Sequence, residues 1–473
     1  MFWDVSPYSF FEEKLMSGLF IREVMLKYSP SAEGKNIGRY ANKVKALAVA
    51  GLLLLGTYQN ANAFEVGVNV HLRHYPKPTD NYLTLIKDYG FTSFRAGYLW
   101  GMVERTAGEF KVVGPLIKED DAFQQGVSKY GLNSLLILAY GNAAYNSPDY
   151  PTTPEAIDGF ANYAYWTAKR FKGKVKYYEI WNEWTVGTGL KKKKAVPPPD
   201  VFAALVKKTS AAIKRADPDA VVMAGSLNPL GQRGIDWFDS LMKLGILNDI
   251  DAISLHPYSY RNENMALRNP EDNLAAIDKF ESRVKAFSKR TVPLYITEMG
   301  VPTYNGPGGL SNSAAAQYIV KYTMMAKARS YIKGVWWYDL IDDGDNPKIN
   351  EHRFGLLNRQ EKPKPSAIAY EKIAKVVRDY SVSDYKETAN GVVSIALKGE
   401  GNQYAMLYWQ KSKTPKDSDQ PGALKSLMSS VTGGPAQQPD VKPLAELTNQ
   451  AAVLQGDTPV LLLSDKPIVA PTH

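Results

Sequence analysis

"VKYYEIWNEW", residues 175–184, begins as a strand and ends on two polar residues set between tryptophans. Its first part is a short, largely apolar run, and Asn182 and Glu183 follow where that run ends. A near-continuous apolar run, without strict alternation, is typical of a parallel strand that is buried on both faces. The stretch therefore predicts a buried parallel strand with polar side chains at its carboxyl end.

Seven further strand-like runs occur between Phe64 and Tyr380, and helical patterns separate them. Residues 154–172, for example, place apolar side chains at helical spacing. Eight strands that alternate with helices predict a (β/α)8 barrel, a TIM barrel of the α/β class. An open doubly wound sheet is the alternative, but no Gly-rich phosphate-binding turn follows the first strand. The seven runs are 64–71, 92–100, 134–140, 220–226, 250–258, 292–300 and 334–340.

The pattern changes after Tyr380, where strand-like runs follow one another without helices between them. A stretch rich in Pro, Gly, Ser and Gln, roughly 411–445, reads as a loop. We therefore expect a barrel over residues 64–380 and a small β-rich, sandwich-like accessory domain over residues 381–473, packed on the barrel.

Residues 1–63 resemble an export signal. Three basic residues precede a short apolar run at 46–56, and the sequence Ala-Asn-Ala follows at 61–63, as in a signal peptide with its cleavage site. The apolar run is shorter than the roughly 20 residues that span a bilayer. We expect a periplasmic or secreted protein, with an uncleaved inner-membrane anchor as the alternative.

Composition narrows the class of protein. The 473 residues are 44% hydrophobic and 22% charged, which is typical of a folded globular protein. The net charge of +9 is modest and forms no basic stripe, so we expect no nucleic-acid partner. The absence of cysteine excludes disulfides, thiolate catalysis and Cys-based metal sites. The 9 Trp and 29 Tyr are more than a core of this size requires, and flat rings of this kind stack on sugars.

Two glutamates end strands on opposite sides of the predicted barrel. Glu183 ends the fourth strand, and Glu298, in "YITEMG" (295–300), ends the seventh. Catalytic groups of such barrels sit at the carboxyl ends of strands, and strands four and seven face each other across the mouth. Glycoside hydrolysis uses two carboxyl groups, one to protonate the leaving oxygen and one to meet the oxocarbenium-like centre. A single glutamate at a strand end is best interpreted as a partner in a salt bridge. The two glutamates together instead predict a glycosidase.

These motifs resemble the clan A glycoside hydrolases. "WNEW" and "ITEMG" stand where that clan has its glutamates, and the pattern is similar to family 39 and to periplasmic enzymes that process biofilm exopolysaccharides. The resemblance implies that Glu183 is the acid/base and Glu298 the nucleophile of a retaining mechanism. It also implies that Asn182 binds the 2-hydroxyl of the sugar. Trp184 departs from the family pattern, in which proline is frequent at that place.

The residues around this pair have expected roles of their own. Glu179 is expected to be buried or structural. The flanking tryptophans are expected to shape and dry the site, because an apolar setting raises the pKa of the acid. Arg95 matches the clan's nucleophile-binding arginine, and the alternative is that it forms an ion pair within the barrel core. His256 is expected at the site, and the alternative is a core histidine whose hydrogen bonds are made within the protein. Either Trp336 or Trp337 is expected to form the floor of the sugar-binding subsite at the bond that is cleaved, and we favour Trp337. The expected substrate-binding residues are Asn182, Arg95, His256, Tyr258, Trp337, His71 and Tyr140.

The sequence thus predicts a retaining glycoside hydrolase, endo-acting on a bacterial exopolysaccharide during its synthesis or export. We expect no metal and no organic cofactor. Lys191–Lys194, beside the predicted site, either attract an acidic polysaccharide or form a solvated surface run. An exo-glycosidase of family 39 type and a non-catalytic polysaccharide-binding barrel are the alternatives.

Overall fold

The computed structural model describes residues 64–190, 194–411, 445–448 and 457–468. The predicted export segment, most of the predicted loop at 411–445 and three of the four lysines of Lys191–Lys194 lie outside the described residues. Within the described ranges, no helix is both long enough and apolar enough to cross a membrane.

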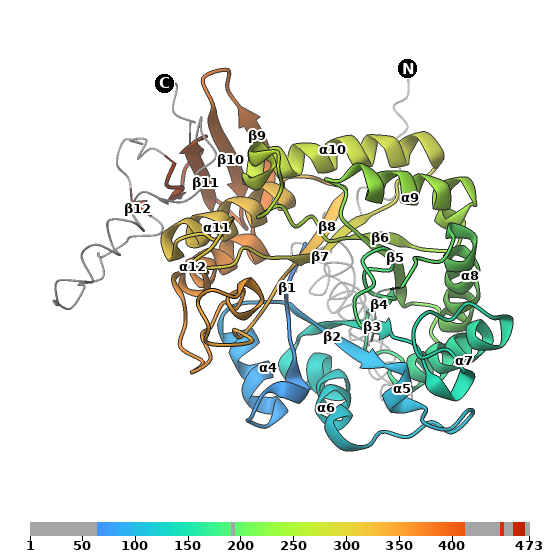
Figure 1. Ribbon diagram of the computed structural model, residues 1–473. Helices are drawn as coiled ribbons and strands as arrows, with labels where there is room; N and C mark the ends of the chain where they lie inside the picture. Colours follow the sequence, from blue (N-terminus) through green and yellow to red (C-terminus); the bar gives the residue numbers. More distant parts are fainter. Residues whose placement is uncertain (1–63, 191–193, 412–444, 449–456, 469–473) are drawn as a thin grey trace, which may run out of the picture. The chain divides into compact units, whose positions relative to one another are not determined.

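Eight parallel strands close into a barrel in chain order, and β8 completes the ring by pairing with β1 (Figure 1). Each of the eight predicted runs overlaps one of these strands, with ends that differ by at most three residues where a strand extends beyond its run, so the predicted TIM barrel is confirmed. The strands are β1 (Glu65–Asn69), β2 (Ser93–Leu99), β3 (Asn133–Ala139), β4 (Tyr177–Ile180), β5 (Val221–Leu227), β6 (Ala252–Leu255), β7 (Leu294–Met299) and β8 (Ile332–Trp337).

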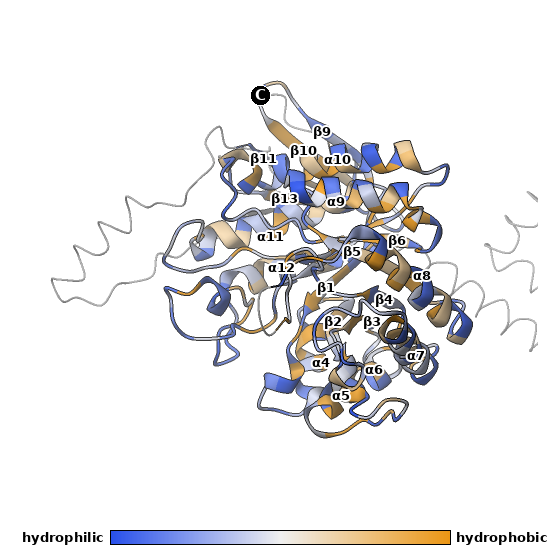
Figure 2. Ribbon diagram, turned by 45° about the vertical axis from the view of Figure 1, so that its right-hand side comes forward, coloured by the Kyte–Doolittle hydropathy of each residue, from blue (hydrophilic) through white to orange (hydrophobic). Residues whose placement is uncertain are grey.

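Helices surround the strands and carry both hydrophilic and hydrophobic faces (Figure 2). The sequence determines their ends locally: Thr153 caps the helix that begins at Pro154 by accepting a hydrogen bond from the Ala156 amide. The helices are α4 (Thr79–Asp88), α5 (Trp100–Val103), α6 (Ile117–Gln125), α7 (Pro154–Arg170), α8 (Pro199–Ala216), α9 (Gln232–Lys243), α10 (Pro270–Phe287), α11 (Asn312–Lys327) and α12 (Pro365–Asp379). Short 3₁₀ segments cover Leu72–His74, Gly114–Leu116, Ala143–Tyr145, Ile246–Asn248, Met265–Arg268 and Asn350–His352, and Gly126–Tyr130 is a π-helical turn.

The inside of the barrel has an apolar layer below a polar layer. Tyr177 of β4 and Tyr295 of β7 lie in the apolar layer with Trp336. Because side chains alternate along a strand, the residues two positions further on face the same interior. These residues are Glu179 and Thr297, which hydrogen-bond each other over 2.8 Å. The polar layer therefore lies directly beneath the carboxyl ends of the strands.

The C-terminal strands form one five-stranded sheet against the barrel helices. Alternate residues, such as Val393, Ile395 and Trp409, belong to the main hydrophobic core, and the Trp409 indole donates to Glu271 of α10 over 2.7 Å. In the described residues this region is a single sheet that packs on the barrel. Its order is β12 (Ala445–Thr448), β13 (Val460–Ser464), β11 (Tyr404–Gln410), β10 (Val392–Lys398) and β9 (Ser381–Glu387), antiparallel except for the β12–β13 pair.

A substitution at Gly67 tests the packing of the barrel interior. An alanine Cβ at this position would lie 2.1 Å from Cδ1 of the Trp336 indole, which is fully buried and donates to Ser93. We expect Gly67→Ala to lower the free energy of unfolding by about 1–3 kcal/mol through overpacking. Gly231→Ala is the matched control, because nothing lies within 4 Å of its Cβ position. Denaturant titration of both variants gives the comparison, and equal stabilities would contradict the predicted packing.

Candidate active site

A pocket of about 720 Å³ opens at the carboxyl ends of the barrel strands. Both predicted glutamates line it, and so do most of the predicted binding residues. His256 lies just beneath its floor and is 1% exposed. Trp337 is not part of the lining. The predicted residues that line the pocket are Glu183, Glu298, Asn182, Arg95, Tyr258, His71 and Tyr140.

Glu183 lies three residues beyond the end of β4, in a turn with unusual backbone geometry. Trp181 and Glu183 have φ angles of 65° and 49°, in the left-handed region that residues other than glycine seldom adopt. Strained residues of this kind concentrate at functional sites. The hydroxyl of Thr188 donates to the Glu183 carboxylate from the following turn.

Glu298 reaches the pocket because the strand that carries it is irregular near its end. Thr297 faces the barrel interior, and the pairing of β7 with β8 shifts register between Ile296 and Met299. Such an irregularity re-aims a side chain. The Glu298 carboxylate accepts hydrogen bonds from Arg95 over 2.5 Å and from the Tyr258 hydroxyl over 3.1 Å.

Arg95 connects the polar groups beneath the pocket. The side chain is 2% exposed, and its nitrogen atoms donate to Glu179 and Asn69 over 2.7 Å each and to Asn182 over 2.9 Å, in addition to Glu298. The ion pair within the barrel core and the contact with the predicted nucleophile are therefore both present. Asn182 also donates to the Tyr140 hydroxyl over 3.2 Å, which fixes its orientation.

His256 lies between the two glutamates. Its Nδ1 is 3.1 Å from Glu183 Oε1 and 3.6 Å from Glu298 Oε2, and its Nε2 is 3.0 Å from the Thr297 hydroxyl. Burial lowers the pKa of His256, but the charges and hydrogen bonds of Glu298, Glu179 and Glu183 outweigh burial and raise that pKa to about 9. A proton therefore stays on this group of side chains at neutral pH.

The pKa values of the neighbouring glutamates are lowered. Burial raises the pKa of Glu179, but Arg95 and His256 hold it well below its usual range, in keeping with a structural role. Burial also raises the pKa of Glu183, but His256 and Thr188 bring it below its usual range. The expectation that an apolar setting raises the pKa of Glu183 is therefore wrong for the free protein, because a charged partner outweighs burial.

The predicted position of Trp337 in the sugar-binding subsite is also wrong. Trp336 points into the barrel, so its neighbour Trp337 points outward, where its indole donates to Thr323 and its ring packs 5.8 Å from that of Tyr322. Trp181 and Trp184 are 1% exposed and pack against each other in the core, with ring centroids 5.0 Å apart. None of these rings reaches the pocket.

Several residues that line the pocket were not predicted from the sequence. Tyr338, one residue after Trp337, supplies the aromatic ring at the end of β8. Alternation puts it on the same face as Trp336, so it could have been found only once the inward face of β8 was known. Other missed lining residues lie on strands, for example Asn69 of β1 and Gly97 of β2. A further set lies between strands, in segments whose course the sequence does not reveal, and includes Thr188, Tyr260, Glu351 and Phe354. Lys194, the one described residue of Lys191–Lys194, forms an ion pair with Asp149.

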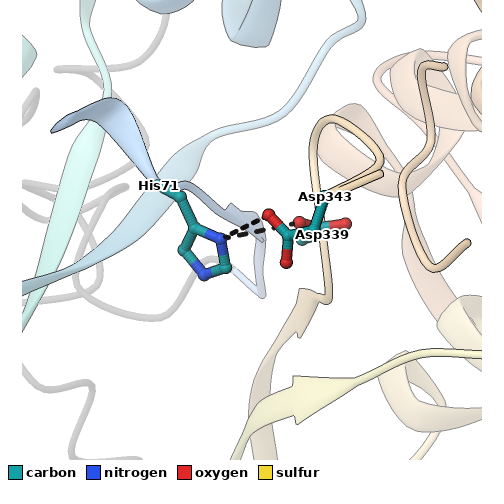
Figure 3. A group of neighbouring side chains, drawn as sticks. All are labelled: His71, Asp339 and Asp343. Carbon is teal, nitrogen blue, oxygen red and sulfur yellow. Dashed lines mark hydrogen bonds and ion pairs between the residues drawn. The ribbon is translucent and has the colours of Figure 1, made fainter. Parts of the chain in front are cut away.

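Two groups of side chains in the described residues have the donor atoms of a metal site. The first consists of Glu183, His256 and Glu298, whose donor atoms lie within 4.8 Å of one another. Its histidine has hydrogen-bond partners at both ring nitrogens, so neither nitrogen is left to bind an ion. The second group consists of His71, Asp339 and Asp343 (Figure 3).

A sequence model of the family described as cellulase (glycosyl hydrolase family 5) matches residues 58–339, which is more than half of the chain. This match agrees with the predicted clan and supplies no support for family 39 in particular. No curated protein sequence matches the chain significantly.

Solved structures of glycoside hydrolases share the fold. A family 39 glycoside hydrolase from Bacteroides cellulosilyticus WH2 is 23% identical with a TM-score of 0.60, over 76% of this chain and 74% of that one. A monomeric beta-xylosidase from Caulobacter crescentus CB15 is 17% identical with a TM-score of 0.53, over 75% of each chain. A GH5_18 protein from Streptomyces cattleya in complex with GlcNAc is 15% identical with a TM-score of 0.53, over 67% of this chain and 81% of that one. At identities this low, the likeness shows the fold alone.

The raised pKa of His256 gives a stability test. Because its pKa in the folded protein is about 9 and its ordinary value is 6.5, protonated His256 stabilises the fold fully below pH 6.5. This contribution is lost as the pH rises through about 9. We expect the difference in unfolding free energy between the wild type and His256→Gln to shrink between these two pH values.

Denaturant titrations from pH 6 to 10 measure this difference. His74→Gln is the control, because His74 is exposed and its pKa is lowered by partial burial and Arg73, so its contribution should stay constant above pH 7. A constant difference for His256→Gln across the same range would contradict the assigned protonation.

Proposed function

Because this chain belongs to the cellulase family, glycosyl hydrolase family 5, we propose that it is a retaining glycoside hydrolase that cleaves a bacterial exopolysaccharide. In this proposal Glu298 is the nucleophile and Glu183 the general acid/base. The periplasmic or secreted location is part of the same proposal. It is supported by the export segment predicted from residues 1–63, which lies outside the described residues.

The separation of the two carboxylates carries the proposal of retention. Glu183 and Glu298 have oxygen atoms within 4.8 Å of each other, and His256 contacts both. Retaining glycosidases hold their carboxyl groups about 5–5.5 Å apart, whereas inverting enzymes need about 6.5–9.5 Å to admit a water molecule. Oxygen atoms this close support direct attack by a carboxylate on the sugar.

The contacts of Glu298 suit a nucleophile. Arg95 and Tyr258 each hold one of its oxygens, so the carboxylate is oriented toward the pocket before substrate binds. In the first step an oxygen of Glu298 bonds to the anomeric carbon, and the glycosidic bond breaks as Glu183 gives a proton to the leaving oxygen. In the second step Glu183 takes a proton from water, which displaces Glu298 and releases the sugar.

The proton for Glu183 comes from its pair with His256. The free protein keeps this proton on His256, 3.1 Å from Glu183 Oε1, because the pKa of the histidine is raised and that of the glutamate is lowered. A shift of the proton along this hydrogen bond converts Glu183 into the acid. The pair therefore titrates as a unit.

Asn182 is placed to orient the sugar. Arg95 donates to its carbonyl oxygen, and its amide nitrogen donates to Tyr140. One N–H of the Asn182 amide thus remains to bind a sugar hydroxyl at the bond that is cleaved. The ring of Tyr338, which lines the pocket, offers the flat apolar face expected of such a subsite.

A second hollow supports endo action. It has a volume of about 610 Å³ and shares Val186 with the first pocket, so surface for a chain longer than one sugar extends beyond the pocket that holds Glu183. Arg233 and Lys194 line this hollow and make it suitable for a polar polymer. Exo action of family 39 type and polysaccharide binding without catalysis are the competing functions.

Azide rescue tests the two glutamates separately. Glu298→Gln should abolish turnover of every substrate, because no covalent intermediate forms without the nucleophile. Glu183→Ala should lose about 10²–10⁴-fold in kcat on polysaccharide but keep its first step on an activated aryl glycoside, which leaves without protonation. Added azide should then restore turnover with retained configuration, which NMR of the product reports.

The controls for this experiment are Asn182→Ala and Glu179→Gln, which should show no response to azide. Rescue of Glu298→Ala by azide, with a product of inverted configuration, independently supports Glu298 as the nucleophile. If azide rescues neither glutamate variant on a substrate that the wild type cleaves, the paired-carboxylate mechanism is wrong.

Product sizes distinguish endo from exo action. Early in the digestion of a purified bacterial exopolysaccharide, we expect oligosaccharides of intermediate length and a rapid fall in polymer size. Size-exclusion chromatography and mass spectrometry measure both. Release of monosaccharide alone, while the polymer stays long, would instead support an exo-glycosidase.

A further inference from the structure

A histidine and two aspartates meet at the wall of the pocket. His71 follows β1, and Asp339 and Asp343 follow β8 (Figure 3). His71 Nδ1 is 3.0 Å from Asp343 Oδ1 and 3.9 Å from Asp339 Oδ2, and one donor atom from each residue lies within 4.8 Å of the other two. The proposed mechanism uses none of the three side chains.

Asp339 has an incomplete set of contacts. The residue is 1% exposed, and among the described residues neither of its carboxylate oxygens accepts a hydrogen bond. Its neighbour Asp342 is also buried, but it has Lys364 at 2.6 Å and Arg353 at 3.4 Å. Buried charges in proteins are paired with an opposite charge or bind a metal, because burial of an unpaired charge is costly.

We propose that His71, Asp339 and Asp343 bind a divalent transition-metal ion, Zn²⁺ or Mn²⁺. One imidazole nitrogen and two carboxylate oxygens are ligands that these ions accept. With metal–ligand bonds of about 2.0–2.1 Å, neighbouring tetrahedral ligands lie roughly 3.3 Å apart. The measured separations of 3.0 and 3.9 Å lie on either side of that value.

The site is open on one side. The side chains of His71 and Asp343 are 32% and 33% exposed, whereas that of Asp339 is 1% exposed. The buried aspartate therefore supplies the inner ligand, and the remaining coordination positions face solvent. Three protein ligands with an open position are typical of metal sites that also bind a small molecule.

The position of the site gives the ion a role with substrate. His71 lines the pocket, and its ring centroid is 5.7 Å from that of Tyr338. A metal ion here would accept hydroxyl or carboxylate oxygens of a sugar in its open positions. This role rests on the proposed function, but metal binding itself does not.

Metal titration of the full chain, untagged and treated with EDTA, tests the proposal without an activity measurement. Isothermal titration calorimetry with ZnCl₂ and with MnCl₂ should show one ion bound per chain in the wild type. Asp343→Asn should weaken this binding roughly tenfold or more, because it removes a ligand. Asp345→Asn is the matched control: it makes the same change at an exposed residue of the same loop and should bind as the wild type does.

A thermal shift measurement gives a second readout. Zn²⁺ should raise the Tm of the wild type and of Asp345→Asn but not of Asp343→Asn or His71→Ala. No saturable binding of either metal, or equal affinity in Asp343→Asn and Asp345→Asn, overturns the proposed site. Glycosidase assays of the wild type with and without Zn²⁺ test the role: an unchanged KM overturns the role with substrate and leaves metal binding standing.

Discussion

The buried guanidinium of Arg95 is the constraint on which the rest of the site depends. It contacts carboxylates on β4 and β7 and amides at the end of β1 and just after β4, so this one side chain of β2 joins the carboxyl ends of three other strands. Removal of one partner of a buried ion pair costs about 3–5 kcal/mol, because the other charge stays buried and unpaired. Arg95 therefore sets both the geometry of Glu298 and the stability of the polar layer beneath it.

The charges of this layer suit the proposed chemistry. Glu179, Glu183 and Glu298 bring three carboxylates together against the positive charges of Arg95 and protonated His256. The group therefore keeps an excess of negative charge wherever the shared proton lies. An oxocarbenium-like transition state is positive, so fixed charges of this sign stabilise it more than they stabilise the neutral substrate.

Alternation along the strands explains where prediction of the site succeeded and where it failed. Two-residue periodicity places Tyr177 and Glu179 on the same inner face of β4. In β8 it points Trp336 into the barrel and Trp337 toward the surrounding helices. The eight strands and the glutamates near the ends of β4 and β7 could be predicted because apolar runs are local signals. Which tryptophan faces inward could not, because that depends on the register of neighbouring strands.

The sequence by itself determined the barrel, its eight strands and two glutamates at opposite strand ends. It did so because hydrophobic runs and their spacing act within short segments, and a closed barrel brings strand ends together. Only the tertiary structure decided the protonation of His256 and the meeting of His71 with Asp343. The pKa of His256 depends on carboxylates from β4 and β7, and His71 and Asp343 are 272 positions apart in the chain. Electrostatic effects act through space between distant segments, so a linear pattern does not contain them.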